Sequence, residues 1–190
     1  MSPRETGRLI LRNWQERDRS LFFEINSDER VMEFYPLRRS RAESDALFDL
    51  WHAELEASGY GKYAVELKET GECMGYCGLV FADAAPALAP DAVEIGWRFS
   101  ARYWGNGYAT EAARSLLAYG FGDCGLDEII SFTLPVNLRS RAVMERLGMT
   151  RDPKGDFDLP RIPYSKPAFK RHVLYRLSRA TWAGTPKVAS

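Results

Sequence analysis

Two glycines between a predicted strand and a predicted helix place the strongest constraint on the fold of this chain. Residues 93–99 alternate apolar and other side chains, as a strand with one buried face does. Gly105 and Gly107 follow that strand, and residues 107–121 have the apolar spacing of a helix. Glycines at the start of a helix let the backbone approach an anion, which the unpaired N–H groups of the first turn can bind. The pattern indicates a phosphate or pyrophosphate site, although glycines can also serve the shape of such a turn alone.

A second segment, residues 137–149, has its own start and stop signals. Asn137 is suited to the N-cap of a helix, and Gly148 is suited to the position just after its end. Asn137 and Ser140 can both be explained by helix capping, or they can be polar groups that contact a ligand.

Together the two segments resemble the GNAT N-acetyltransferase superfamily. Arg102-x-x-Gly105-x-Gly107, with Ala109 two residues further on, resembles the acetyl-CoA pyrophosphate loop of that family. The longer string from residue 103 to residue 112, Tyr-Trp-Gly-Asn-Gly-Tyr-Ala-Thr-Glu-Ala, looks like the RimJ/RimL-like branch. Residues 137–149 are similar to the block Asn-x-x-Ser followed by a helix that ends in Leu-Gly-Met. In the family the Asn of this block holds the pantetheine arm and the Ser lies by the thiol.

The resemblance covers residues 6–178 and implies an α/β (α+β) fold with a single GNAT-like domain. The expected sheet is central, mixed, mostly antiparallel and twisted, with about seven strands, helices on both faces and a splayed pair of parallel strands. Residues 179–190 are expected to form a flexible C-terminal tail. One subgroup of the branch has a histidine where this chain has Leu159, so the role of that histidine does not carry over.

The same resemblance implies acetyl-CoA as co-substrate. The main chain around residues 95–99 is expected to pair with the pantetheine arm as an added strand would. The residues expected to hold acetyl-CoA are Trp97, Arg98, Phe99, Arg102, Gly105, Asn106, Gly107, Tyr108, Ala109, Thr110 and Asn137.

Two residues are candidates for the chemistry of amine acetylation. Glu94 alternates with the apolar face of its strand and is the candidate general base, directly or through a water; a surface glutamate, or one paired with Arg98, is the alternative. Residues 138–150 contain no tyrosine, which many GNAT enzymes are believed to use as the acid. Ser140 is therefore the candidate hydrogen-bond donor to the leaving thiolate, where the helix dipole also favours negative charge.

The acceptor is expected to be a primary amine, either on a small molecule or at a protein N-terminus. Residues 14–35, 82–90 and 152–167 are expected to form the variable walls of the site that binds this acceptor. Asp152, Asp156 and Asp158 could attract a cationic amine, or they could belong to a solvated loop. The family resemblance is also compatible with a homodimer.

Charge and composition exclude several other classes. Lysine plus arginine and aspartate plus glutamate number 26 each, so no net field favours nucleic acid or an anionic membrane. No apolar run approaches the ~20 residues of a membrane span, and no signal-peptide core is evident at the N-terminus. The odd number of cysteines, three, favours reduced thiols in a cytoplasmic protein, and only two histidines are available for a metal, so none is expected.

Three other functions would need different residues or would lack turnover. A dinucleotide oxidoreductase would need a small residue where Thr110 stands and an acid after the following strand, whereas Asp127 and Glu128 precede it. A serine hydrolase would need Gly-x-Ser-x-Gly, which the chain lacks. A non-catalytic acyl-CoA-binding module would keep the loop without turnover, and it is the alternative that remains.

The remaining elements follow from apolar spacing and breakers. Ser40 and Glu43 fit a capping box, and Thr70-Gly71-Glu72 is typical of a hairpin turn. Expected are strands at 8–12, 63–68, 74–81, 128–134 and 172–177, helices at 14–26 and from Ser40 to Gly59, an exposed loop at 82–90 and a proline-rich stretch at 152–167. The strand at 128–134 should lie parallel to that at 93–99, because a helix connects them.

Overall fold

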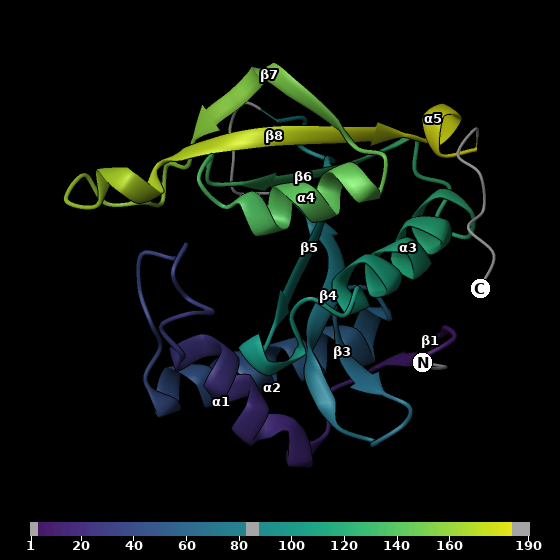
Figure 1. Ribbon diagram of the computed structural model, residues 1–190, viewed down its shortest axis with the longest axis vertical. Helices are drawn as coiled ribbons and strands as arrows, with labels where there is room; N and C mark the ends of the chain where they lie inside the picture. The colour runs from purple at the N-terminus through teal and green to yellow at the C-terminus, as the bar shows by residue number, and fades with distance from the viewer. Residues whose placement is uncertain (1–3, 83–87, 184–190) are drawn as a thin grey trace. The chain divides into compact units, whose positions relative to one another are not determined.

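A computed structural model describes residues 4–82 and 88–183 of the chain (Figure 1). Hydrogen-bonded strands follow the order β1-β2-β3-β4-β5-β6-β8-β7 in one open, mostly antiparallel sheet. The strands are β1 Arg4–Glu5, β2 Leu9–Arg12, β3 Lys62–Leu67, β4 Cys73–Phe81, β5 Val93–Phe99, β6 Glu128–Thr133, β7 Thr150–Asp158 and β8 Arg171–Ser178. The helices are α1 Arg19–Ser27, α2 Arg41–Ser58, α3 Tyr108–Phe121, α4 Leu138–Arg146 and α5 Arg179–Ala183, with 3-10 turns η1 Glu16–Asp18, η2 Ala101–Tyr103 and η3 Pro167–Phe169. The predicted GNAT-like architecture is confirmed, with eight strands where about seven were expected.

Contacts between Cα atoms group the chain into two compact units. Unit 1 contains Met1–Leu79 and Gly96–Leu116, and unit 2 contains Val80–Ile95 and Leu117–Ser190. Neither unit is a continuous segment, because β4, β5 and α3 each run from one unit into the other.

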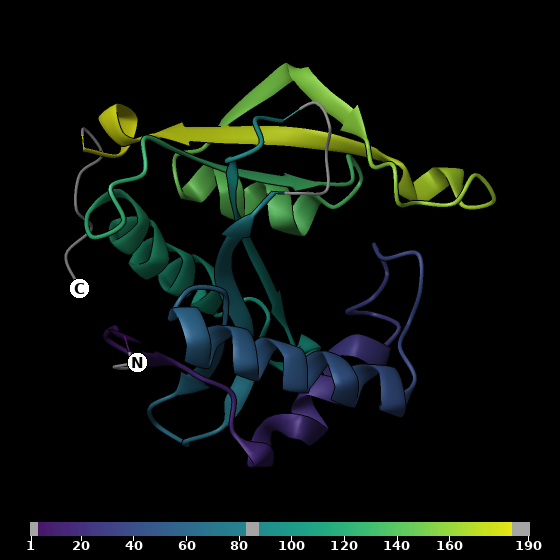
Figure 2. The ribbon, with the colours of Figure 1, turned by 180° about the vertical axis from the view of Figure 1, so that it is seen from behind.

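Unit 1 is centred on aromatic side chains that two helices bring against the sheet. In Figure 2, α2 lies across β3, and α1 contacts α2. Trp14 and Phe22 meet edge to face with ring centroids 4.7 Å apart, and Trp51 meets Phe22 in the same way at 5.1 Å. Trp51 also contacts Tyr76 of β4 at 5.0 Å, which links the helices to the strand. Such pairs add about 0.5–1.5 kcal/mol each beyond the burial of their area.

A buried ionic cluster lies at one end of β2. Arg12 donates from Nε to Glu66 at 2.7 Å, and from its two terminal nitrogens to the Asp18 carboxylate at 2.6 and 3.0 Å. All three side chains are buried. Arg17, which is mostly exposed, adds a 2.8 Å hydrogen bond to Glu66 from outside the cluster. Burial lowers the pKa of Arg12, but the two carboxylates outweigh it and raise that pKa above its ordinary value.

The first helix begins later than its apolar spacing predicts. Residues 16–18 form η1, and α1 starts at Arg19 rather than at Trp14. Asp18 causes the delay, because its carboxylate accepts a hydrogen bond from the backbone N–H of Gln15 while it is held by Arg12. Trp14 therefore lies before the helix, buried in the core of unit 1, and donates from its indole N–H to the carbonyl of Lys62 at 2.8 Å.

Local signals set the next elements correctly. The capping box is confirmed, since the Ser40 hydroxyl accepts from the Glu43 N–H at 3.3 Å and the Glu43 carboxylate accepts from the Ser40 N–H at 2.7 Å. The helix α2 ends at the expected Gly59. Strands β3 and β4 form the predicted antiparallel hairpin around Gly71.

Unit 2 is built on β6, β8 and β7, with α4 along one face of this layer (Figure 1). Strand β8 pairs antiparallel with β6 over six register positions and with β7 on its other side. The predicted parallel pair is confirmed, with Glu94 of β5 opposite Ile130 of β6. The Ser131 hydroxyl reinforces this pair by donating to the Ile95 carbonyl at 2.8 Å.

The proline-rich stretch at 152–167 was given no strand in the sequence analysis, yet its first half forms one. Strand β7 runs through Pro153, with an irregularity in its register between Asp152 and Phe157. Its carboxylates are held by arginines, Asp152 by Arg176 at 2.7 Å and Asp156 by Arg151 at 2.5 Å. These two aspartates therefore belong to the ion pairs of a strand and not to a solvated loop.

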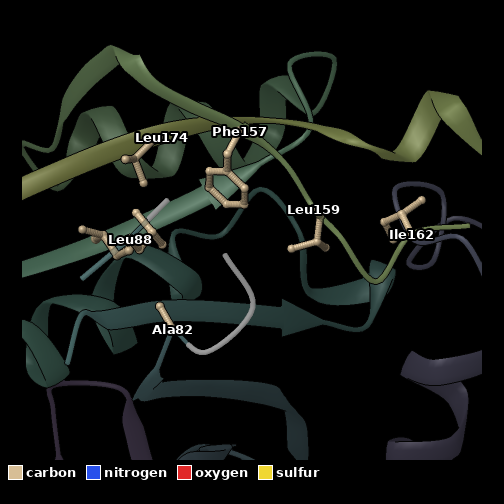
Figure 3. Packing of buried hydrophobic residues seen from close by; sticks show 7 residues of the cluster. Ala82, Leu88, Phe157, Leu159, Ile162 and Leu174 are labelled. Carbon is tan, nitrogen blue, oxygen red and sulfur yellow. The ribbon is translucent and has the colours of Figure 1, made fainter. Parts of the chain in front are cut away.

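Apolar side chains on both sides of residues 83–87 are buried in unit 2. Ala82 and Leu88 belong to a cluster with Ile130, Phe157, Leu159, Ile162 and Leu174 (Figure 3). The prediction of an exposed loop is wrong at these two positions, while residues 83–87 lie outside the described residues. Leu159 is buried in the same cluster, so the position where the related subgroup has a histidine is apolar here.

The last described residues form a short helix. Residues 179–183 form α5, where a tail was expected, and Trp182 packs against Phe121 with ring centroids 6.0 Å apart. Residues 184–190 of the expected tail lie outside the described residues. Within residues 4–82 and 88–183, no helix is long and apolar enough to cross a membrane.

The three cysteines are free thiols in different surroundings. Cys73 and Cys77 are buried in β4, whereas Cys124 is exposed. Burial raises the pKa of Cys73 to about 12 and raises that of Cys77 further above the ordinary value. No group of three or more metal-ligating side chains is found among the described residues.

Acid is expected to destabilise the fold through His172. The ring is stacked on Phe157, with centroids 5.8 Å apart, and burial lowers its pKa below the ordinary 6.5 although it bonds the Lys170 carbonyl. The unfolded chain then binds the proton more readily than the folded protein does. The contribution of the neutral His172 ring to the free energy of unfolding is therefore complete above pH 6.5, and it is lost as the pH falls from there through the folded-state pKa. Urea unfolding at about pH 7.5 and about pH 5 should show a smaller acid loss for His172→Phe than for the unaltered chain. Equal losses in both proteins would contradict this assignment.

Candidate active site

The glycine loop of unit 1 has the backbone that its sequence predicts. After β5 ends at Phe99, η2 leads to Gly105 and Gly107, whose φ angles are +83° and +78°. Residues with a side chain rarely adopt this left-handed backbone conformation, so glycine is favoured at both positions. A Cβ atom at Gly105 would meet nothing within 4 Å, and one at Gly107 would meet only Arg8, at 3.7 Å. The outer face of the loop is therefore open to a ligand.

Helix α3 starts directly at this loop. Its first backbone hydrogen bond runs from the Glu111 N–H to the Gly107 carbonyl at 3.0 Å. The N–H groups of Tyr108, Ala109 and Thr110 precede that bond and have no partner within the helix. These donors and the positive end of the helix dipole suit an anion such as a phosphate.

Residues of the connection between β1 and β2 brace the loop. Glu111, in the first turn of α3, accepts hydrogen bonds from the Thr6 hydroxyl at 2.6 Å and from the Arg8 backbone at 2.9 Å. The Arg8 guanidinium contacts the same carboxylate at 2.6 Å, bonds the Asn106 carbonyl at 3.1 Å and lies 4.6 Å from the Tyr108 ring centroid. Burial raises the pKa of Glu111, but Thr6 and Arg8 outweigh it and lower the pKa below its ordinary value. The carboxylate is thus held ionised, with a cation beside it.

The sequence did not predict this bracing cluster. Thr6 and Arg8 lie more than 100 residues before Glu111, at separations of 105 and 103 residues. The only local signal was an acidic residue in the first turn of a helix, which stabilises helices in general.

Aromatic and arginine side chains around the loop have defined partners in unit 1. Arg102 donates to Glu24 of α1 at 2.9 Å and lies 4.9 Å from the Tyr103 ring centroid. Glu24 also accepts from the buried Ser100 hydroxyl at 2.5 Å. The guanidinium of Arg102 is thus tied to an acid in this structure, and its contact with a pyrophosphate stays a prediction.

The other predicted residues of this unit line up along β5 and the loop. Phe99 is buried, Trp97 is half-buried, and the indole N–H of Trp104 donates to the Phe99 carbonyl at 2.9 Å. Asn106 turns its amide inward, toward the carbonyls of Tyr103 and Trp104, both at 3.2 Å. The structure therefore brings Trp97–Phe99, Arg102 and Gly105–Thr110 together in unit 1.

Unit 2 holds the two catalytic candidates and Asn137. Glu94 is half-buried on β5, at the register position opposite Ile130. Asn137 is buried before α4, and its side-chain oxygen accepts from the Ser140 N–H at 3.2 Å. Its amide nitrogen donates to the Ser140 hydroxyl at 3.1 Å and to the Thr133 hydroxyl at 2.9 Å.

Helix capping by Asn137 is therefore confirmed, and it does not compete with a role for Ser140. Because the Asn137 amide donates to the Ser140 oxygen, the Ser140 hydroxyl proton is left to point elsewhere. A hydroxyl in the first turn of α4, with its lone pair engaged, is arranged as a donor toward an anion. The tyrosine that contacts α4 comes from β8: buried Tyr175 donates to Glu145 at 3.0 Å and accepts from Arg141 at 3.2 Å.

Comparison with known proteins identifies the family of this chain. The family model described as "Acetyltransferase (GNAT) domain" matches residues 8–150. The uncharacterized protein YkkB of Bacillus subtilis is 35% identical over 147 residues, which is 76% of this chain and 83% of that protein. FsC-acetyl coenzyme A-N(2)-transacetylase of Aspergillus fumigatus is 32% identical over 151 residues, covering 76% of this chain and 63% of that protein. A GNAT-family acetyltransferase structure from Bacillus anthracis aligns with a TM-score of 0.76 and 26% identity, over 94% of this chain and 99% of that one.

Proposed function

We propose, because this chain belongs to the acetyltransferase (GNAT) family, that it transfers an acetyl group to a primary amine by direct attack in a ternary complex. The family uses acetyl-CoA as co-substrate, and relatives of this chain are named N-acetyltransferases. The observation that carries the proposal is the open glycine loop at the start of α3, within the segment that the family model matches.

The loop fits the phosphate end of acetyl-CoA. Both glycines have positive φ angles, and a side chain built at Gly105 would occupy open space where a ligand can approach the backbone. The N–H groups of Gly105–Thr110 would hold the pyrophosphate, and Asn137 would hold an amide of the pantetheine arm. The thioester supplies an activated acyl group, so positioning of the amine provides a large part of the rate.

Glu94 and Ser140 are assigned the two proton-related roles. The attacking amine must lose a proton, and Glu94 takes it directly or through one water. The sulfur gains negative charge, and the Ser140 hydroxyl donates a hydrogen bond to it because its oxygen already accepts from Asn137. Since an alkyl hydroxyl is a weak acid, Ser140 stabilises the thiolate without giving up its proton.

The nature of the acceptor rests on the amine chemistry of the family. One relative is named as an N(2)-transacetylase that uses acetyl coenzyme A, which supports an amine acceptor. Acceptors to test are N-terminal peptides, amino acids, polyamines and aminoglycosides. Release of free coenzyme A thiol with one of these classes, together with heat of acetyl-CoA binding, would identify it.

Glu94→Gln is expected to lower the rate of acetyl transfer at least about 10-fold, as loss of a general base does. The affinity for acetyl-CoA, measured by calorimetry, should stay nearly unchanged, because the variant removes a charge without removing the loop. Glu128→Gln is the matched control, because Glu128 is an exposed glutamate on neighbouring β6 that pairs with Arg176. Turnover in Glu94→Gln equal to that of the control across the pH range would remove Glu94 from the mechanism.

A further inference from the structure

Arg98 is a cation in an unusual position in unit 1. It lies on β5, and its guanidinium carbon is 4.0 Å from the ring centroid of Tyr35 and 5.5 Å from that of Tyr76. One terminal nitrogen donates to the side-chain oxygen of Asn26 at 2.7 Å. Asn26 is itself fully buried on α1 and is fixed by a 2.8 Å hydrogen bond from its amide to the Phe22 carbonyl. The guanidinium is therefore held in place by neutral groups.

No carboxylate neutralises this cation among residues 4–82 and 88–183. The hydrogen bond to Asn26 uses one of five N–H donors, and Nε is buried with no acceptor in the described structure. Arg12 of the same unit shows the usual solution, since two acids hold it. Glu24, which lies two residues before Asn26 on α1, is engaged by Ser100 and Arg102. Because partly buried charges are normally paired, Arg98 is suited to an anion supplied from outside the chain.

The surroundings of Arg98 also indicate which ligand supplies it. The backbone of β5 was assigned to the pantetheine arm, but the Arg98 side chain leaves the strand toward Asn26 and Tyr35. Both belong to residues 14–35, the segment expected to form a wall for the acceptor. Tyr35 is 39% exposed, and Arg98 is only half-buried, so solvent reaches this end of the cluster. Burial lowers the pKa of Arg98, but Tyr35 and Tyr76 outweigh it and raise the pKa, which keeps the group charged.

We propose that Arg98 binds the carboxylate of the acceptor, so that the substrate is a small amine that also carries a carboxylate. This inference rests on the proposed amine acetylation. A planar guanidinium packed on tyrosine rings offers its edge to a planar carboxylate, which is the geometry of a paired Arg–carboxylate contact. Polyamines and aminoglycosides, which are cationic, would be disfavoured by the same charge.

The test compares amino acids of increasing distance between amine and carboxylate, each with its carboxamide. Because the amine of an amino acid amide loses its proton more easily, chemistry alone would favour the amide. We expect the opposite, with kcat/KM for one amino acid at least about 10-fold above that of its amide. In Arg98→Gln this preference should disappear because KM for the amino acid rises. Arg98→Lys should keep part of the preference. The affinity for acetyl-CoA should not change in either variant. Arg41→Gln is the control, because Arg41 also lies over an aromatic ring, that of Phe23, in unit 1.

Binding of the amino acid, measured by calorimetry, separates this inference from the proposed function. If the amino acid binds the unaltered chain and not Arg98→Gln, yet no acetyl transfer occurs, the Arg98 site stands and the proposed function falls. If amines are acetylated with no preference for the carboxylate in the unaltered chain, the proposed function stands and the Arg98 site is overturned. This second comparison needs no variant, so misfolding of Arg98→Gln cannot hide the answer.

Discussion

Replacement of Gly107 by valine is expected to weaken acetyl-CoA binding by about 100-fold or more, a loss of about 2.7 kcal/mol. The residue has a φ of +78° at the entrance to α3, a conformation that a β-branched side chain resists. Relief of that strain would turn the N–H groups of the first helical turn away from the pyrophosphate. A branched side chain would also cover the backbone that the phosphate must approach. Calorimetry with acetyl-CoA measures the loss directly.

Gly71→Val is the matched control for this variant. Gly71 has a similar φ of +69° in the turn between β3 and β4, and a Cβ atom there would meet nothing within 4 Å. It should therefore carry the same backbone strain, with a lowered melting temperature, and bind acetyl-CoA normally. Normal affinity for acetyl-CoA in Gly107→Val would contradict the assignment of the loop. Lost affinity in Gly71→Val would show that both variants lose binding because the fold is destabilised.

Loss of the Arg12 side chain is expected to be the most destabilising single change in unit 1. Arg12→Met would leave the buried carboxylates of Asp18 and Glu66 without their shared cation, at a cost of about 3–5 kcal/mol. Denaturant unfolding monitored by circular dichroism measures this difference in the free energy of unfolding.

Arg17→Met provides the comparison, because Arg17 contacts the same Glu66 carboxylate from a side chain that is 58% exposed. Its loss should cost less than about 1 kcal/mol, as for other exposed ion pairs. Replacing Arg12, Asp18 and Glu66 together by apolar residues should recover much of the loss, since no unpaired charge would then remain buried. Equal effects of Arg12→Met and Arg17→Met would show that burial of the cluster contributes nothing.

Elements whose ends are set by local chemistry could be predicted from the sequence. Ser40 and Glu43 start α2 through their reciprocal hydrogen bonds, and Asn137 caps α4, because these interactions span only three residues. The alternation in residues 93–99 defines β5 at its observed bounds. The parallel pairing of β5 with β6 followed from the helix between them.

Elements that depend on distant partners could not be predicted in this way. The start of α1 is displaced by Asp18, whose carboxylate is held by Arg12 of β2. Strand β7 contains a proline and few apolar residues. It is held to β8 partly by the ion pair of Asp152 with Arg176 and by the hydrogen bond from the Leu174 N–H to the Asp156 carboxylate at 3.2 Å. Its sequence resembles a loop because it is rich in charge, and the partner of Asp152, Arg176, lies on a different strand.

The same distinction between local and distant partners applies to the residues of the candidate site. The glycines of the loop and Asn137 could be predicted from the sequence, because backbone conformation and helix capping restrict the residue type at a single position. The bracing of the loop by Thr6 and Arg8 could not be predicted, since these residues lie between β1 and β2, far from the loop in the sequence. Arg98 was assigned to the cofactor from its place in β5, and only the contacts with Asn26 and Tyr35 show where its side chain goes.

The unequal exposure of the cysteines gives the protein one chemically addressable position. Cys73 and Cys77 are buried and held as protonated thiols, so alkylating agents and aromatic disulfides should react first with Cys124. A colorimetric reagent for released coenzyme A would then see a constant protein background of one equivalent. The same residue would accept a single fluorophore or spin label just beyond α3, in unit 2, without removal of any native cysteine.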